Sequence, residues 1–221
     1  MLRKRVRAAG GLKAEILRVA GRLFREHGYD KTTFRMIADE LDIAPSAIAY
    51  HFKAKSYIVR ELFTVCRSIL REYVTENLAE GFNYYLLNGI VEISFFREVM
   101  KNERIWTLFN RRDNLEFLSE SWLATIKDGL WEVTDNFQKD FNEKEIHAAA
   151  VMSVGARISL FKEFTHNKTM SIDEYCYYFV YLAGVLSRLD EASIQRNIRR
   201  AFEFADSHQF PKTPLFEDFS P

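Results

Sequence analysis

The chain has 221 residues, of which 48% are apolar, and this composition excludes an intrinsically disordered protein. Its formal net charge is zero, but residues 1–60 hold 13 lysines and arginines against 6 aspartates and glutamates, a net of +7, whereas residues 61–221 hold 18 against 25, a net of −7. This asymmetry predicts that the N-terminal part binds a polyanion, with a chance solvated face as the alternative.

The first elements in chain order are three short helices. Apolar residues recur at helical spacing over Lys13–His27, and Gly28 is placed to end that helix in a left-handed conformation. Thr33 is suited to N-cap a second helix, Phe34–Leu41. Pro45 can open a third helix at its first position, where the missing N–H does no harm. These signals predict a helix-turn-helix.

Helical patterns also fill the rest of the chain, which has no proline between residues 46 and 210. A long helix is expected to begin near Lys55. The further helices are expected near Phe82–Met100, Glu103–Asn110, Leu115–Phe137, Glu143–Thr165, Ser171–Leu186 and Glu191–Ser207. We therefore expect an all-α fold that ends in a mobile, proline-containing tail.

The third helix has an unusual outer face. If Ile48 and Phe52 point into the core, the residues left facing outward are small, polar or aromatic: Ser46, Ala47, Tyr50 and His51. Small residues at a helix N-terminus allow close approach to a major groove, and the terminus itself favours a phosphate. This face is the candidate DNA-binding surface, although His51 could instead pack against the first helix.

The stretch "FREHGYDKTTFRMIADELDIAPSAIAYHFKAKSYI" resembles the DNA-binding domain of the TetR family of bacterial transcription regulators. The resemblance covers about residues 16–58. It implies that the following residues contact DNA: Thr33, Tyr50, His51 and Lys55 at phosphates, and Arg35, Pro45, Ser46 and Ala47 at base edges or the groove wall. Arg35 is the best candidate for base readout because a guanidinium can bind guanine O6 and N7 together. Asp42 and Ala49 depart from the family, which commonly has Gly and Tyr there.

The resemblance also implies the domain organisation. A helix-turn-helix DNA-binding domain is expected at residues 1–55, a helical ligand-binding and dimerisation domain at 56–207, and a C-terminal tail at 208–221. Residues 1–12 form a basic arm that could lie along DNA or be a disordered tail. Its basic side chains are Arg3, Lys4, Arg5 and Arg7.

A homodimer is expected, because one helix-turn-helix makes few contacts and the family pairs its last two long helices across a two-fold axis. Small residues let such helices approach closely, although they could also pack within one subunit. The candidate interface residues are Ala149, Met152, Ala156, Tyr178 and Ala183.

In this family the region between these parts houses a small-molecule pocket. The candidate lining residues, which could equally be core, are Phe96, Met100, Trp106, Phe109, Trp122, Ile126, Trp131, Arg157 and Phe161. Arg157 stands out because it lies in an apolar helix, where a buried guanidinium needs a carboxylate partner from the protein or an acidic ligand.

The resulting prediction is a ligand-responsive regulator that binds a double-stranded DNA operator as a homodimer. It is expected to be a repressor, released by a largely apolar or aromatic effector. The alternative is a constitutive DNA-binding protein whose helical body recruits a protein partner. No catalytic constellation, metal cluster or cofactor motif is evident, and Cys66 and Cys176 indicate a reducing compartment. No apolar segment spans a membrane, so a cytoplasmic location is expected.

Overall fold

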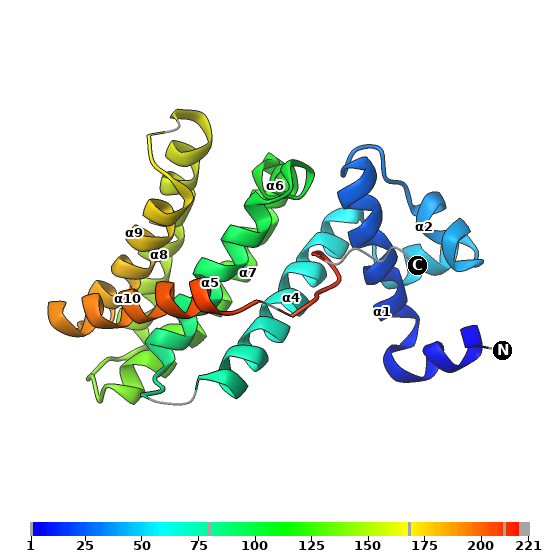
Figure 1. Cartoon of the computed structure of the whole chain (residues 1–221). Coiled ribbons are helices and arrows are strands. Elements are labelled where there is room, and N and C mark those ends of the chain that lie inside the picture. Colours follow the sequence, from blue (N-terminus) through cyan, green and yellow to red (C-terminus); the bar gives the residue numbers. More distant parts are fainter. Residues whose placement is uncertain (1, 79–80, 168, 210, 217–221) are drawn as a thin grey trace. The chain divides into compact units, whose positions relative to one another are not determined.

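The computed structural model describes residues 2–78, 81–167, 169–209 and 211–216, without the side chains of 2–10, 110, 112–118, 121 and 166–167. Every regular element in these ranges is a helix, which confirms the all-α class (Figure 1). The elements are α1 (Leu2–His27), α2 (Phe34–Leu41), α3 (Pro45–His51), α4 (Lys55–Asn77), α5 (Tyr84–Met100), α6 (Glu103–Asn110), α7 (Arg112–Asn136), α8 (Glu143–Lys162), the π-helix η1 (Glu163–Asn167), α9 (Ile172–Leu186) and α10 (Glu191–Ser207). Within the described ranges, no helix combines the length and the hydropathy needed to cross a membrane.

Helix boundaries follow local capping signals. Gly28 adopts φ 83° after α1, and the Thr33 hydroxyl accepts a hydrogen bond from an N–H of the first turn of α2, as predicted. Asn142 and Ser171 each begin a capping box, at α8 and α9 respectively. The main difference lies at the end of α8, where the expected helix to residue 165 changes to a π-helical turn after Lys162.

The chain divides into two compact units, each described by itself. The first, termed the N-unit, contains residues 1–69, 99–117 and 212–221, and the second, termed the C-unit, contains residues 70–98 and 118–211. The N-unit thus adds the first part of α4, α6 and a C-terminal segment to the expected helix-turn-helix domain. Its core is formed by buried apolar residues of α1 to α4, among them Ile16, Leu23, Phe24, Ile37, Ala38, Ile48, Phe52, Ile58 and Leu62.

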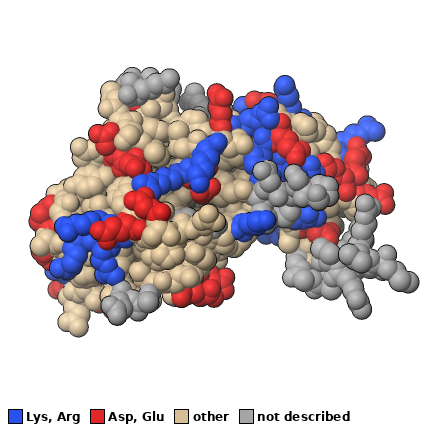
Figure 2. Space-filling model, in the orientation of Figure 1, with Lys and Arg blue, Asp and Glu red and all other residues tan. Residues whose placement is uncertain are grey.

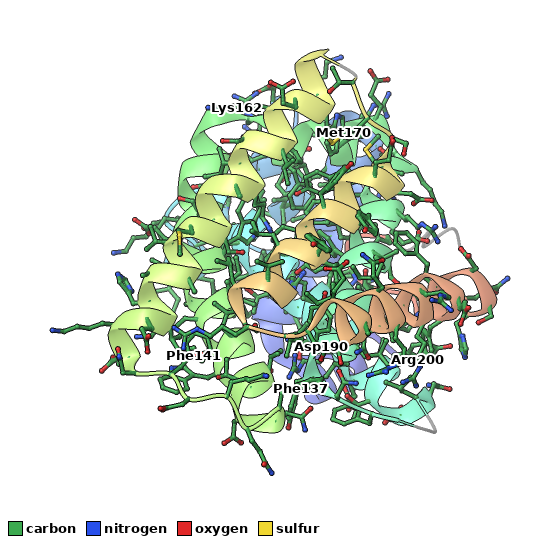
Figure 3. All side chains as sticks on the ribbon, turned by 90° about the vertical axis from the view of Figure 1, so that its left-hand side faces the viewer. Phe137, Phe141, Lys162, Met170, Asp190 and Arg200 are labelled. Carbon is green, nitrogen blue, oxygen red and sulfur yellow. The ribbon has the colours of Figure 1, made fainter. Side chains whose placement is uncertain are left out.

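The C-unit contains an antiparallel pair of long helices, α8 and α9. Figure 3 shows Lys162 and Met170 at the end of the pair where the chain turns back, and Phe141 and Asp190 toward the opposite end. Side chains of neighbouring helices pack closely against α9. Gly184 of α9 lies against Tyr85 and Ile194, and a Cβ added there would come within 2.7 Å of both side chains.

Both chain ends differ from expectation. The first helix begins at Leu2 rather than near Lys13 and contains a kink at Gly11, where φ is 64°. The basic side chains of the expected arm (Arg3, Lys4, Arg5 and Arg7) lie outside the described residues. At the C-terminus, Thr213 and Leu215 are each 1% exposed, so this part of the expected mobile tail is packed in the N-unit. The sequence gives no warning of this packing because the partners are remote helices.

Candidate nucleic-acid interface

The connection between α1 and α2 is held by two threonines. The Thr32 hydroxyl is buried and can donate to the carbonyls of Leu23 and Gly28, at 3.1 and 2.8 Å. The Thr33 hydroxyl accepts from the Met36 N–H at 3.2 Å, which caps α2. Because Thr33 is exposed, its hydroxyl can also donate a hydrogen bond to solvent or to a ligand such as a phosphate.

The turn between α2 and α3 explains the first departure from the family pattern. Asp42 adopts a left-handed conformation with φ 54° and ψ 49°, a region that favours glycine and tolerates aspartate. The turn closes through two backbone hydrogen bonds, from the Asp42 N–H to the Asp39 carbonyl and from the Ile43 N–H to the Ala38 carbonyl. The aspartate therefore preserves the left-handed turn, at the cost of some backbone strain.

The third helix presents the outward face that the sequence predicts. Ile48 and Phe52 are buried, whereas Tyr50 is 85% exposed. His51 is also exposed and meets the Tyr50 ring edge-on at 5.3 Å between centroids, so it does not pack against α1. Ser46 and Pro45 are exposed at the first turn, and Ala47 is half-buried. The helix thus offers a small N-terminal end followed by two aromatic hydrogen-bonding groups.

Arg35 lies on the outer face of α2. Its side chain is 84% exposed, and its Nε lies 3.8 Å from the Asp39 carboxylate one turn later. Such exposed pairs are weak, so the guanidinium can exchange this partner for another. Figure 2 shows basic and acidic side chains intermixed over the visible face of the N-unit. Within this unit Arg22 pairs with both Glu26 and Glu40. The excess of positive charge in residues 1–60 is therefore not one uninterrupted patch on that face.

The Lys55 side chain binds backbone carbonyls of the protein, whereas a phosphate contact was expected. Its ammonium donates to the carbonyls of Tyr29 at 2.5 Å and Thr32 at 2.8 Å, and it lies 4.4 Å from the centroid of the Tyr29 ring. Burial lowers the pKa of Lys55 below its ordinary value, although the nearby Asp30 carboxylate opposes this effect. The side chain clamps the α1–α2 connection from the start of α4. The family resemblance predicted a phosphate contact for Lys55. Its actual acceptors are backbone carbonyls, and a side-chain pattern in the sequence cannot reveal those.

Replacing Lys55 by methionine is expected to lower the free energy of unfolding by about 1–2 kcal/mol. Methionine keeps the apolar stem but leaves the Tyr29 and Thr32 carbonyls without their charged donor. Urea denaturation followed by circular dichroism measures the change. Lys53→Met is the matched control, because Lys53 is exposed two residues earlier. Equal stability of the two variants would show that the clamp contributes nothing.

Two arginines, Arg104 of α6 and Arg111 just after it, contact the same connection, and no sequence pattern predicted either contact. Arg104 donates to the carbonyls of Arg25 and Glu26 in the last turn of α1, where a helix leaves carbonyls without intrahelical partners. Arg111 binds Asp30, with 2.6 Å between Nη1 and Oδ2, and lies over the Tyr29 ring at 5.1 Å. The Tyr29 ring is thus contacted by two cations. Helix α6 consequently belongs to the N-unit as a support of the helix-turn-helix.

The nine candidate pocket residues do not share one environment. Phe96, Trp122, Arg157 and Phe161 are buried in the C-unit, and Ile126 is half-buried there. Met100, Trp106 and Phe109 fall in the N-unit, where the Phe109 ring lies 6.1 Å from that of Phe63. Trp131 is 38% exposed, which argues against a lining role. Helical spacing alone cannot distinguish the inner from the outer face of α7.

Arg157 has the protein carboxylate that the sequence argument requires. Its Nη2 lies 2.8 Å from Glu92 Oε2, and both side chains are almost fully buried, at 1% and 8% exposure. The contact is a close ion pair whose alignment falls short of a directed hydrogen bond. Aromatic rings surround the guanidinium, whose Cζ lies 3.6 Å from the ring centroid of Phe179 and 5.0 Å from that of Trp122.

The candidate dimer residues also differ in their exposure to solvent. Met152 and Tyr178 are 55% and 50% exposed, on α8 and α9. Ala156 and Ala183 are half-buried. Ala149, by contrast, is buried in a cluster with Leu130, Ile146 and Ala150 inside the C-unit, so it cannot serve as an interface residue. The prediction for Ala149 was wrong because small residues suit helix contacts within a subunit as well as between subunits.

Comparison with known proteins relates these features to a family. Residues 16–62 match the family model described as bacterial regulatory proteins, tetR family. The probable acrEF/envCD operon repressors of two Escherichia coli strains are each 33% identical over 72 residues, which is 33% of this chain and 32% of the repressor. The chain thus aligns with about a third of the length of these curated relatives.

Solved structures give a weaker likeness. A structure of the TetR family protein CprB from Streptomyces coelicolor A3(2) covers 94% of this chain and 100% of its own, with 16% identity and a TM-score of 0.46. A structure of CprB with its biological operator sequence has 15% identity, the same coverages and a TM-score of 0.47. The match to the tetR family model on residues 16–62 coincides with α1 to α3 and the start of α4, so the similarity to this family lies in the helix-turn-helix described above.

Proposed function

We propose that the protein is a transcriptional repressor that binds a palindromic operator as a homodimer and releases it when a small molecule binds the C-unit. The observation that carries the DNA-binding part is the outer face of α3, with Tyr50 and His51 exposed on a helix whose inner face is fixed by Ile48 and Phe52. The repressor sense is supported by the curated relatives, which are named operon repressors.

In this proposal α3 enters the major groove with its N-terminal end leading. Pro45, Ser46 and Ala47 carry little side-chain bulk, so the backbone can approach the base edges closely. Tyr50 and His51 then reach phosphate oxygens, and the exposed Thr33 hydroxyl binds a phosphate at the start of α2. Arg35 leaves Asp39 to contact a base.

Variants of Arg35 and Tyr50 test the DNA contacts, with an operator first selected from a random DNA pool. Tyr50→Ala is expected to weaken operator and non-specific DNA binding alike, because a phosphate contact carries no sequence information. Arg35→Ala is expected to reduce discrimination at one base pair by about 1–3 kcal/mol. Binding is measured by fluorescence anisotropy at fixed salt, with Lys144→Ala on α8 as a control for loss of one exposed positive charge. Wild-type affinity and specificity in both variants would refute the assigned contacts.

The dimer part rests on exposed apolar side chains of α8 and α9. Val151, Met152, Tyr178 and Val185 are all large, apolar and exposed on this helix pair. Large apolar side chains exposed on one pair of helices are typical of a protein–protein interaction site. A second copy of the chain is the occupant we propose, because two recognition helices must be held about 34–36 Å apart to read successive major grooves.

The effector part rests on buried polar groups of the C-unit. Arg157 Nε, the Ser153 hydroxyl and the Tyr175 hydroxyl are buried without a hydrogen-bond partner among the described residues. A ligand oxygen placed among them would supply the missing acceptor. Because Glu92 already balances the charge of Arg157, we propose a neutral aromatic effector with a carbonyl or hydroxyl oxygen rather than a carboxylate.

A further inference from the structure

We infer that residues 212–216 form an intramolecular clasp, which packs against both α1 and α4 and holds these two helices of the N-unit together. This inference does not depend on the proposed repressor function. After α10 ends at Ser207, the chain passes from the C-unit into the N-unit, where the segment runs beside α4 (Figure 1). Two of its side chains, Thr213 and Leu215, are each 1% exposed.

Hydrogen bonds attach the clasp to both helices. On α4, the Cys66 thiol and the Thr213 hydroxyl are 3.2 Å apart. On α1, Arg25 Nη1 donates to the Leu215 carbonyl at 3.3 Å. The clasp also has a defined shape of its own, because the Phe216 N–H donates to the Thr213 carbonyl at 3.0 Å and closes a turn. The segment is therefore bound as a folded turn rather than laid loosely over the surface.

Gly21 shows that α1 is shaped to receive this segment. It lies inside α1, where alanine would favour the helix more than glycine does. A Cβ at this position would come within 2.2 Å of the Pro214 carbonyl oxygen and 3.0 Å of its carbon, which is closer than atoms can approach. The nearest side-chain atom, Leu62 Cδ2, would remain at an ordinary 3.4 Å. The backbone of the clasp is thus the specific neighbour that requires glycine.

The clasp contacts the two helices that flank the helix-turn-helix in the chain. Helix α1 carries the connection to α2, and α4 follows α3 directly. A segment bound to both helices stabilises their mutual packing within the N-unit. Displacement of residues 212–216 is expected to loosen the contact between α1 and α4.

Thiol reactivity in the full-length chain tests the clasp. Cys66 is buried beneath Thr213, and burial raises the pKa of its thiol to about 11 despite hydrogen bonds from Thr213 and the Leu215 backbone that lower it. In a Cys176→Ser background Cys66 is the only thiol. Gly21→Ala and Leu215→Ala are each expected to increase its rate of reaction with a disulfide reagent at pH 8 at least tenfold, because release of the clasp exposes the thiol and lowers its pKa.

Gly155→Ala is the matched control, because it makes the same chemical change in a helix where nothing lies within 4 Å of the added Cβ. Its Cys66 rate should equal that of the Cys176→Ser parent. The double variant Gly21→Ala/Leu215→Ala should react no faster than either single variant, since both act by releasing the same segment. Circular dichroism confirms that each variant is folded. Control-like rates in both Gly21→Ala and Leu215→Ala, or additive effects in the double variant, would overturn the inference.

Discussion

Replacing Arg157 by methionine is expected to lower the free energy of unfolding by about 3–5 kcal/mol. The substitution removes the guanidinium that lies 2.8 Å from the Glu92 carboxylate and puts an apolar side chain opposite that buried carboxylate. Removing one charge from such a pair is costly because the remaining charge has lost its hydration without compensation. The aromatic rings of Phe179 and Trp122, which face the guanidinium, cannot replace it as a counter-charge for a carboxylate.

The double variant Arg157→Met/Glu92→Leu separates this explanation from a simple packing defect. With both charges removed, stability should return to within about 1 kcal/mol of the wild type, since a buried pair and apolar residues of similar volume are often equivalent. Urea denaturation of the wild type, both single variants and the double variant measures the coupling directly. A loss below about 1 kcal/mol in Arg157→Met, or equal losses in the single and double variants, would contradict the proposed role of the pair.

The folded double variant also reports on the effector site. A compound that releases the wild-type operator complex by binding near Arg157 should no longer do so when the guanidinium is absent. If release persists unchanged, the effector binds elsewhere in the chain. Stability and effector response are thus measured on the same protein, so a loss of response is not confused with unfolding.

Tyr178→Asp combined with Met152→Lys is expected to convert the proposed homodimer to a monomer. Both residues are exposed within one chain, so the substitutions should leave the subunit folded while placing two charges in the interface. Sedimentation velocity measures the oligomeric state. Operator affinity should fall on the order of 100-fold or more, because a monomer presents one recognition helix and specific binding exceeds non-specific binding by factors of that size and above.

Phe82→Asp provides the control for this experiment. Phe82 is exposed but precedes α5 and belongs to neither α8 nor α9, so its replacement should leave both the dimer and operator binding intact. A double variant of Met152 and Tyr178 that remains dimeric would refute the proposed interface. A monomer that retained wild-type operator affinity would instead refute the requirement for two recognition helices.

The sequence predicted those parts of the candidate interface that depend on neighbours in the chain. The Thr33 cap, the glycine after α1, the proline that opens α3 and the outward direction of Tyr50 were all evident from spacing and capping chemistry. Such features are determined within one or two helical turns. The left-handed turn at Asp42 was not evident, because aspartate occupies a position where glycine would have signalled it.

Other residues had functions that the sequence could not assign. Lys55 was expected on phosphate, but its ammonium is bound to carbonyls of the α1–α2 connection. Ala149 was expected at the dimer interface, but it lies in the core of the C-unit. Arg104 and Arg111 gave no signal at all, because their partners lie about 80 positions earlier in the chain.

By itself, then, the sequence determined the all-α class, the helix-turn-helix and the exposed face of α3. These depend on helical periodicity, capping and turn chemistry, which act between residues a few positions apart. Only the tertiary structure decided that Glu92 pairs with Arg157, that Lys55 binds the α1–α2 connection and that residues 212–216 contact both α1 and α4. Each of these depends on which distant segments meet in the folded chain, and periodicity carries no information about that choice.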